Sequence, residues 1–150
     1  MPKRIVFAAL GAASIAFHIY LIFSGLVPNL VSRPLHLLFA LPWVFLFMAD
    51  RWRDLIIGGA WTLGGIFCCL YIVFNESSLS DQYGALEGSG QIAMAIFLLA
   101  VVLEMARWAI GWPLPMVAAT ALAYGLFGQH LPGEFGHPGL PIESFLGTLT

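Results

Sequence analysis

The chain has 150 residues, of which 60% are hydrophobic and 9% are charged, and its mean hydropathy is +0.90. Soluble domains carry about 25% charged residues, so a charged fraction this low argues against a water-soluble fold. Disorder requires low hydrophobicity and nucleic-acid binding requires a basic excess, whereas the net charge here is −2.

Four apolar runs approach or reach the roughly 20 residues that a helix needs to cross a bilayer. They cover residues 5–27, 31–49, 55–74 and 91–110. The first follows Lys3 and Arg4 and exceeds the roughly 7–15 apolar residues of a signal peptide, so we interpret it as a retained span. The second is short and contains Pro42, which predicts a kink. The pattern predicts an all-α integral membrane protein with a four-helix transmembrane bundle.

A fifth apolar run, residues 113–127, is shorter than an untilted span requires. It either crosses the membrane or re-enters it, and its many small residues favour packing against other helices. The tail that follows, residues 129–150, is rich in Gly and Pro and contains no Lys or Arg. Its apolar residues approximate an amphipathic pattern, which predicts a segment lying along the membrane interface.

The basic residues predict the orientation, because cytoplasmic loops retain Lys and Arg. Five of them lie on one predicted side: Lys3, Arg4, Arg51, Arg53 and Arg107. Only Arg33 lies on the other side, and the loop at residues 75–90 contains no basic residue. We therefore expect a multi-pass protein with a cytoplasmic N-terminus and a translocated loop 75–90.

Rows of small residues mark candidate helix contacts. Ala8, Ala12 and Ala16 share one face of the first helix, and Ala60 and Gly64 share one face of the third. Such spacing lets helices approach closely, so we expect these rows to drive bundle assembly.

Few ionisable residues lie inside the predicted spans. His18 and His36 are interpreted as neutral side chains bonded to a neighbouring helix, because neither span holds a carboxylate; a proton relay or a ligand is the alternative. Glu104 and Arg107 are i,i+3 neighbours near a helix end, which predicts a boundary ion pair in preference to a substrate site.

The most metal-like spacing is formed by His130, Glu134 and His137. Pro132, Gly133, Gly136 and Pro138 interrupt this segment and prevent the helical presentation that a metal motif of this type uses. We therefore predict no metal site and no cofactor. The sequence also contains no nucleophile–base constellation, so we expect no enzyme activity.

Three motifs support a family resemblance. Residues 103–115 read LEMARWAIGWPLP, residues 124–128 read YGLFG, and residues 131–133 read LPG. Together with Arg33-Pro34-Leu35-His36 at the start of the second span, they resemble the fused membrane subunit of tripartite ATP-independent periplasmic (TRAP) transporters, of the type served by TAXI binding proteins. The resemblance implies a four-helix Q-like domain at residues 1–111 and the start of the large M-like permease domain at residues 112–150.

The resemblance also implies a function. We expect the membrane scaffold part of an inner-membrane symporter that imports a small organic solute, such as an organic acid, with the large permease domain and a periplasmic binding protein as partners. Glu104, Arg107, Gly111 and Pro113 are then structural candidates. In that family the chain continues for several hundred residues, so we expect a fragment, a truncated product or a separate subunit, and we assign no solute or sodium ligand here. The alternative is an independent small membrane protein that acts in helix–helix assembly, and a membrane-embedded enzyme is the third choice.

Overall fold

The computed structural model of the chain describes residues 2–25, 27–83, 85–133, 136 and 138. The helices are α1 (Pro2–Ser24), α2 (Asn29–Pro42), α3 (Trp52–Phe74), α4 (Glu76–Asp81), α5 (Gly88–Ile110) and α6 (Pro113–Phe127). A π-helical turn, Trp43–Phe47, follows α2, and a 3-10 turn, Gly128–His130, follows α6. Since these residues include no strand, the all-α prediction is confirmed.

Four helical segments are long and apolar enough to cross a membrane. They are Arg4–Ser24, Asn29–Phe47, Trp52–Phe74 and Gly88–Ile110, and they correspond to the four predicted spans. Contacts divide the chain into two compact units, unit 1 (Met1–Ser80) and unit 2 (Asp81–Thr150). The division at residues 111 and 112 rests on family resemblance rather than on contacts, and it stays a prediction, as does the four-helix bundle.

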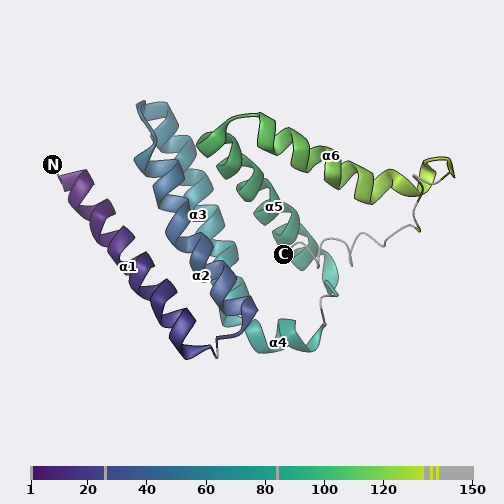
Figure 1. Cartoon of the computed structure of the whole chain (residues 1–150), viewed down its shortest axis with the longest axis horizontal. Coiled ribbons are helices and arrows are strands. Elements are labelled where there is room, and N and C mark those ends of the chain that lie inside the picture. The colour runs from purple at the N-terminus through teal and green to yellow at the C-terminus, as the bar shows by residue number, and fades with distance from the viewer. Residues whose placement is uncertain (1, 26, 84, 134–135, 137, 139–150) are drawn as a thin grey trace. The chain divides into compact units, whose positions relative to one another are not determined.

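In unit 1, α1, α2 and α3 lie side by side, and α2 runs opposite to its two neighbours (Figure 1). The first helix ends at Ser24, earlier than the predicted residue 27. Gly25 has a φ of +58°, and its N–H donates to the Leu21 carbonyl at 3.2 Å. A glycine in the left-handed region is a common helix terminator, and Pro28 follows it.

A π-helical turn begins at the residue after Pro42, where the sequence predicts a kink; the kink itself stays a prediction. Proline has no N–H to donate within a helix, so the hydrogen-bond register is free to change there. The turn places Phe45 in the interior of unit 1, where its side chain, like that of Leu41, has no exposed surface.

The π-helical turn and α3 approach each other closely at Gly58. A methyl group at Gly58 would lie 2.3 Å from the carbonyl oxygen of Phe45, so only glycine fits. Thr62, one turn further on, is buried and donates its hydroxyl to the Gly58 carbonyl at 2.7 Å. Gly58, Thr62 and Gly65 are all buried, whereas Ala60 of the predicted row is exposed.

The first helix also packs through a different face from the one predicted. Phe7 is buried, and its ring centroid lies 5.4 Å from that of Trp43 and 5.0 Å from that of Phe47. A methyl group at Gly11 would lie 3.3 Å from Cζ2 of Trp43. The alanine row of α1, which consists of Ala8, Ala12 and Ala16, is exposed. In α1 the contact is therefore made by large aromatic rings over a glycine, and the alanine row does not take part in it.

In unit 2, α6 turns sharply away from the end of α5 (Figure 1). It has 15 residues and coincides with the predicted run, so its length is about 22 Å, below the roughly 30 Å of a bilayer core. The predicted interfacial tail lies mostly outside the described residues.

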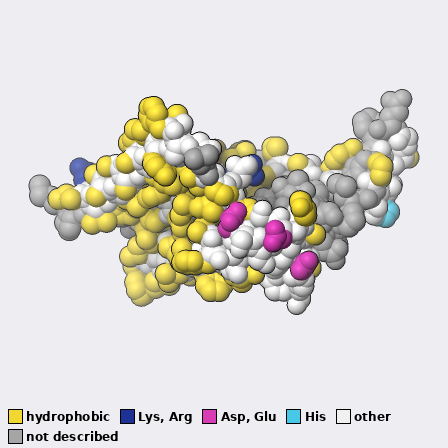
Figure 2. Space-filling model, turned by 90° about the horizontal axis from the view of Figure 1, so that it is seen from below, with side chains coloured by type: hydrophobic (Ala, Val, Ile, Leu, Met, Phe, Trp, Pro, Cys, Tyr) yellow, Lys and Arg dark blue, Asp and Glu magenta, His cyan; other side chains and the backbone are white. Residues whose placement is uncertain are grey.

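Large apolar side chains are exposed on four helices, α1, α3, α5 and α6. Figure 2 shows hydrophobic side chains over much of the visible surface. This is the surface expected of helices that face lipid or other helices rather than water.

Candidate functional site

Two polar clusters stand out against the apolar helices, one in each unit. The first joins α1 to α2 through His18 and His36. Nε2 of His18 and Nδ1 of His36 are hydrogen-bonded, and the ring centroids lie 4.6 Å apart at an interplanar angle of 83°. Phe17 lies beside this pair, 5.5 Å from His18 and 5.5 Å from Phe39 between ring centroids.

The hydrogen bonds fix the protons of the His18–His36 pair. Nδ1 of His18 lies 2.6 Å from the main-chain oxygen of Ser14. A carbonyl oxygen only accepts, so this nitrogen carries the proton, and Nε2 of a neutral His18 is an acceptor. Nδ1 of His36 must then donate to it, which leaves Nε2 of His36 as the remaining acceptor. The chain of donors runs in one direction, from His36 through His18 to the Ser14 carbonyl.

The two histidines lie at similar depths along their helices. His18 precedes the end of α1 by six residues, about 9 Å, and His36 follows the start of α2 by seven residues, about 10 Å. No carboxylate occurs in α1 or α2 to balance an added cation. Arg33, one turn before His36, would oppose one. The neutral state that the sequence predicts for both rings stays a prediction, and their hydrogen bond joins α1 to α2.

The hydrogen bond to a neighbouring helix that the sequence predicts for each histidine is present. The sequence did not indicate that each is the partner of the other, because that depends on how α1 and α2 align. Among the described residues, no group of three or more His, Cys, Asp or Glu side chains is placed to hold a metal ion.

The second cluster lies in the last turns of α5. Nε of Arg107 donates to Oε2 of Glu104 at 2.7 Å, and Nη2 of Arg107 donates to Oε1 at 2.5 Å. Nε1 of Trp108 donates to the same Oε1 at 2.8 Å. The predicted contact between Glu104 and Arg107 is therefore present as a two-pronged ion pair, a strong geometry for carboxylate and guanidinium.

This cluster is partly shielded from solvent and continues into the connection to α6. The exposed fraction of the side chain is 20% for Glu104 and 34% for Arg107. The guanidinium carbon of Arg107 lies 5.5 Å from the centre of the Trp112 ring. Arg107 therefore contacts both the helix that carries it and Trp112, in the connection between α5 and α6.

Gly111 and Pro113 form the break itself. Gly111 has a φ of +97°, in the left-handed region, and its N–H donates to the Arg107 carbonyl at 2.9 Å. Pro113 occupies the first turn of α6, where its missing N–H costs nothing. The described geometry thus gives both residues a part in the corner between α5 and α6, while their wider structural role stays a prediction.

Two members of the metal-like triplet, Glu134 and His137, lie outside the described residues. Nδ1 of His130 lies 3.3 Å from the Phe127 carbonyl oxygen, and its side chain is exposed.

No protein-family model, curated protein or solved structure matches this chain.

Proposed function

We propose that the chain is the membrane scaffold part of a TRAP-type secondary transporter, of the kind served by TAXI binding proteins. In this proposal it lies in the inner membrane with its N-terminus in the cytoplasm. It supports a large permease domain or subunit that takes up a small organic acid from a periplasmic binding protein with sodium. The motifs at residues 103–115, 124–128 and 131–133 supply the family assignment.

One observation carries the scaffold role. Every described charged side chain within the four span-length helices lies within about two turns of a span end. Arg4, Arg33, Arg53 and Asp54 lie near the starts of their spans, and Glu104 and Arg107 lie near an end. Solute and ion sites of secondary transporters lie near the midplane between structural repeats, so this distribution favours a stationary element over a pathway.

The bonding of Glu104 supports the same role. Its carboxylate accepts three N–H donors from its own helix, two from Arg107 and one from Trp108. A solute would have to displace these bonds to be recognised there. The Glu104–Arg107 ion pair instead stabilises the end of α5, next to the connection to α6.

Uptake into liposomes tests the scaffold role. The purified chain is reconstituted into liposomes with an imposed sodium gradient, and a binding protein loaded with a labelled organic acid is added. These liposomes should take up no more label than empty vesicles. Co-purification from the native membrane should recover a large permease polypeptide. Gradient-dependent uptake by the chain alone would overturn the scaffold role.

Cysteine labelling tests the orientation. Ser78 is exposed in α4, inside the predicted translocated loop, and the two native cysteines, Cys68 and Cys69, are buried. In a background without those cysteines, Ser78→Cys should react with an impermeant maleimide in cells whose inner membrane is intact. Labelling only after the inner membrane is permeabilised would contradict a cytoplasmic N-terminus.

A second candidate function is independent helix–helix assembly, and the exposed alanine row of α1 favours it. Recovery of a self-contained oligomer without a permease polypeptide would support this candidate over the transporter scaffold.

A further inference from the structure

An apolar groove runs along unit 1 between α1 and the neighbouring end of α2 and α3. Its volume is about 700 Å³. The lining residues are all apolar and include Val6, Phe7, Ala9 and Ala13 of α1, with Leu46 and Leu55 on the other wall. On α1 the lining extends from Val6 to Ala13, about 10 Å along the helix axis.

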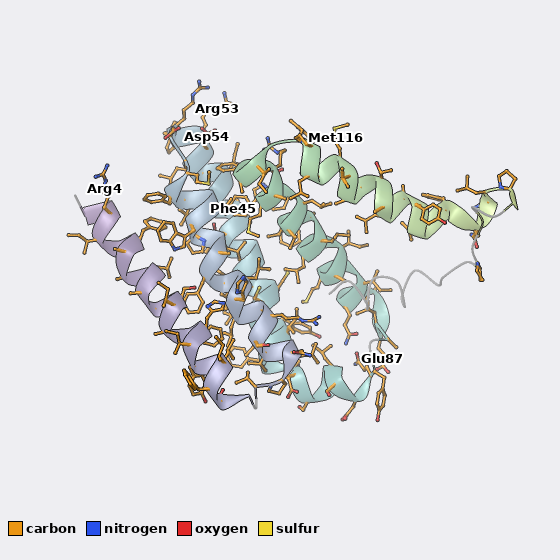
Figure 3. All side chains as sticks on the ribbon, in the orientation of Figure 1. Arg4, Phe45, Arg53, Asp54, Glu87 and Met116 are labelled. Carbon is orange, nitrogen blue, oxygen red and sulfur yellow. The ribbon has the colours of Figure 1, made fainter. Side chains whose placement is uncertain are left out.

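Arginine side chains lie at the end of unit 1 where this groove begins. Arg4 precedes Val6 by two residues on α1, and Arg53 precedes Leu55 by two residues on α3. Figure 3 places Arg4 and Arg53 at the same end of unit 1. Arg51 lies in the connection just before α3, and all three arginine side chains are exposed.

The charge at this end is positive. Among the described side chains, Arg4, Arg51 and Arg53 oppose Asp50 and Asp54, so three positive and two negative side chains leave an excess of one. In the part of the chain that the structure describes, the only ion pair is that between Glu104 and Arg107, so these arginines form none there. Asp54 lies in the first turn of α3, where the helix dipole favours a negative charge.

An occupant of this groove must combine two chemistries. The part inside the groove must be apolar, because no lining side chain offers a hydrogen bond, and the part at the groove's mouth must be anionic, to match the arginines. We propose that the groove holds one acyl chain of an anionic phospholipid and that Arg4 and Arg53 bind its phosphate. The inference rests on the membrane placement in the proposed function and does not depend on transport.

The predicted orientation fits this occupant. It puts the arginine end at the cytoplasmic leaflet, where anionic lipids attract basic residues close to a span. An acyl chain has the flexibility to follow a shallow groove with an uneven aliphatic and aromatic wall. The roughly 10 Å of groove would hold the upper part of such a chain, next to the headgroup.

Native mass spectrometry of the full chain tests the proposal. The protein is released from micelles that contain equal amounts of phosphatidylglycerol and phosphatidylcholine with identical acyl chains. One phosphatidylglycerol should be retained in preference to phosphatidylcholine. Arg4→Gln and Arg53→Gln should each lower that preference about fivefold. Arg33→Gln, which alters the arginine at the opposite end of α2, should leave the preference unchanged.

Filling the groove separates a bound chain from simple surface attraction. Ala9→Phe places a ring in the groove and should abolish retention of phosphatidylglycerol. Ala8→Phe is the matched control, because Ala8 is exposed and does not line the groove. Each variant must keep the melting midpoint of the parent chain to be scored.

Three results would overturn the proposal. They are equal retention of the two lipids, retention that survives Ala9→Phe, and no retained lipid at all, as expected if another protein segment fills the groove. None of them would alter the Ser78→Cys labelling or the uptake result, so failure of this inference is distinguishable from failure of the proposed function.

Discussion

The polar and tightly packed contacts of unit 1 join different helices, whereas the polar contacts of unit 2 lie within one helix. In unit 1 the decisive contacts join different helices: Gly58 meets the carbonyl of Phe45, and His18 meets His36. In unit 2 the corresponding contacts are local, since Glu104, Arg107 and Trp108 belong to successive turns of one helix. Unit 1 therefore depends on helix alignment, whereas the polar cluster of unit 2 can form as soon as α5 forms.

This difference has an energetic consequence. A substitution that adds atoms at an interhelical contact of unit 1 must displace a neighbouring helix, which is packed at high density. A substitution in the unit 2 cluster removes charge-assisted hydrogen bonds but leaves the helix backbone in place. Backbone clashes in unit 1 should thus have the largest effects on stability.

The largest effect is expected for Gly58→Ala. The added methyl group would lie 2.3 Å from a carbonyl oxygen, so α3 must move away from the π-helical turn. We expect a loss of about 3 kcal/mol in the free energy of unfolding, the upper end for an overpacked core. Denaturant unfolding in detergent micelles, followed by tryptophan fluorescence, measures it.

The neighbouring Gly59 provides the control. A methyl group there would meet nothing within 4 Å. Gly59→Ala should therefore stabilise the protein by about 0.5–1 kcal/mol, because alanine is the better helix former. Equal unfolding free energies for the two variants would contradict the close approach of α3 and the turn.

The next largest effect is expected at the ion pair. Arg107→Ala leaves the Glu104 carboxylate with the Trp108 N–H alone and should cost about 2 kcal/mol, since the pair is only partly shielded. Exchanging the two residues should restore the yield of folded protein, measured by size-exclusion chromatography, better than either single alanine does.

A different outcome would reassign this cluster. If both single alanines assemble normally but raise the half-saturation constant for solute in a complete transporter, Glu104 and Arg107 contribute to solute recognition. The structural role proposed for them would then be wrong.

Local features of the sequence were sufficient to predict several elements. The limits of α6 follow from Pro113 at its start and Gly128 just after its end. The contact of Glu104 with Arg107 follows from i,i+3 spacing alone. Each helix limit and the ion pair depend on residues within about one turn of the feature itself, which is why no tertiary information was needed.

Which side of each helix packs could not be predicted in the same way. In a helix that is apolar all round, the face toward lipid is as hydrophobic as the face toward a neighbour, so periodicity carries no signal. The small-residue spacing therefore indicates the alanine row of α1 as a contact, and no sequence pattern indicates the Phe7 face. Gly58 and the His18–His36 bond similarly require the alignment of two helices.

A smaller effect is expected for the histidine pair. His18→Ala and His36→Ala should each lower the unfolding free energy, and the double variant should lose little more than either one. The coupling energy should be about 1 kcal/mol, typical of a polar contact between membrane helices. His130→Ala, at an exposed histidine of unit 2, should change nothing measurable. A coupling energy of zero would show that the two rings do not stabilise each other.

The smallest effect is expected for Ala12→Leu, which tests which face of α1 packs in unit 1. Ala12 is exposed, so the larger side chain should change the unfolding free energy by less than about 0.5 kcal/mol. Its neighbour Gly11 lies against Trp43, with only 3.3 Å available to a new methyl group, so Gly11→Leu should be clearly more destabilising. The reverse order would show that the alanine row, and not the Phe7 face, is the packed side of α1. If Ala12→Leu leaves stability unchanged but prevents recovery of a partner polypeptide, the exposed row is the surface through which the scaffold binds that partner.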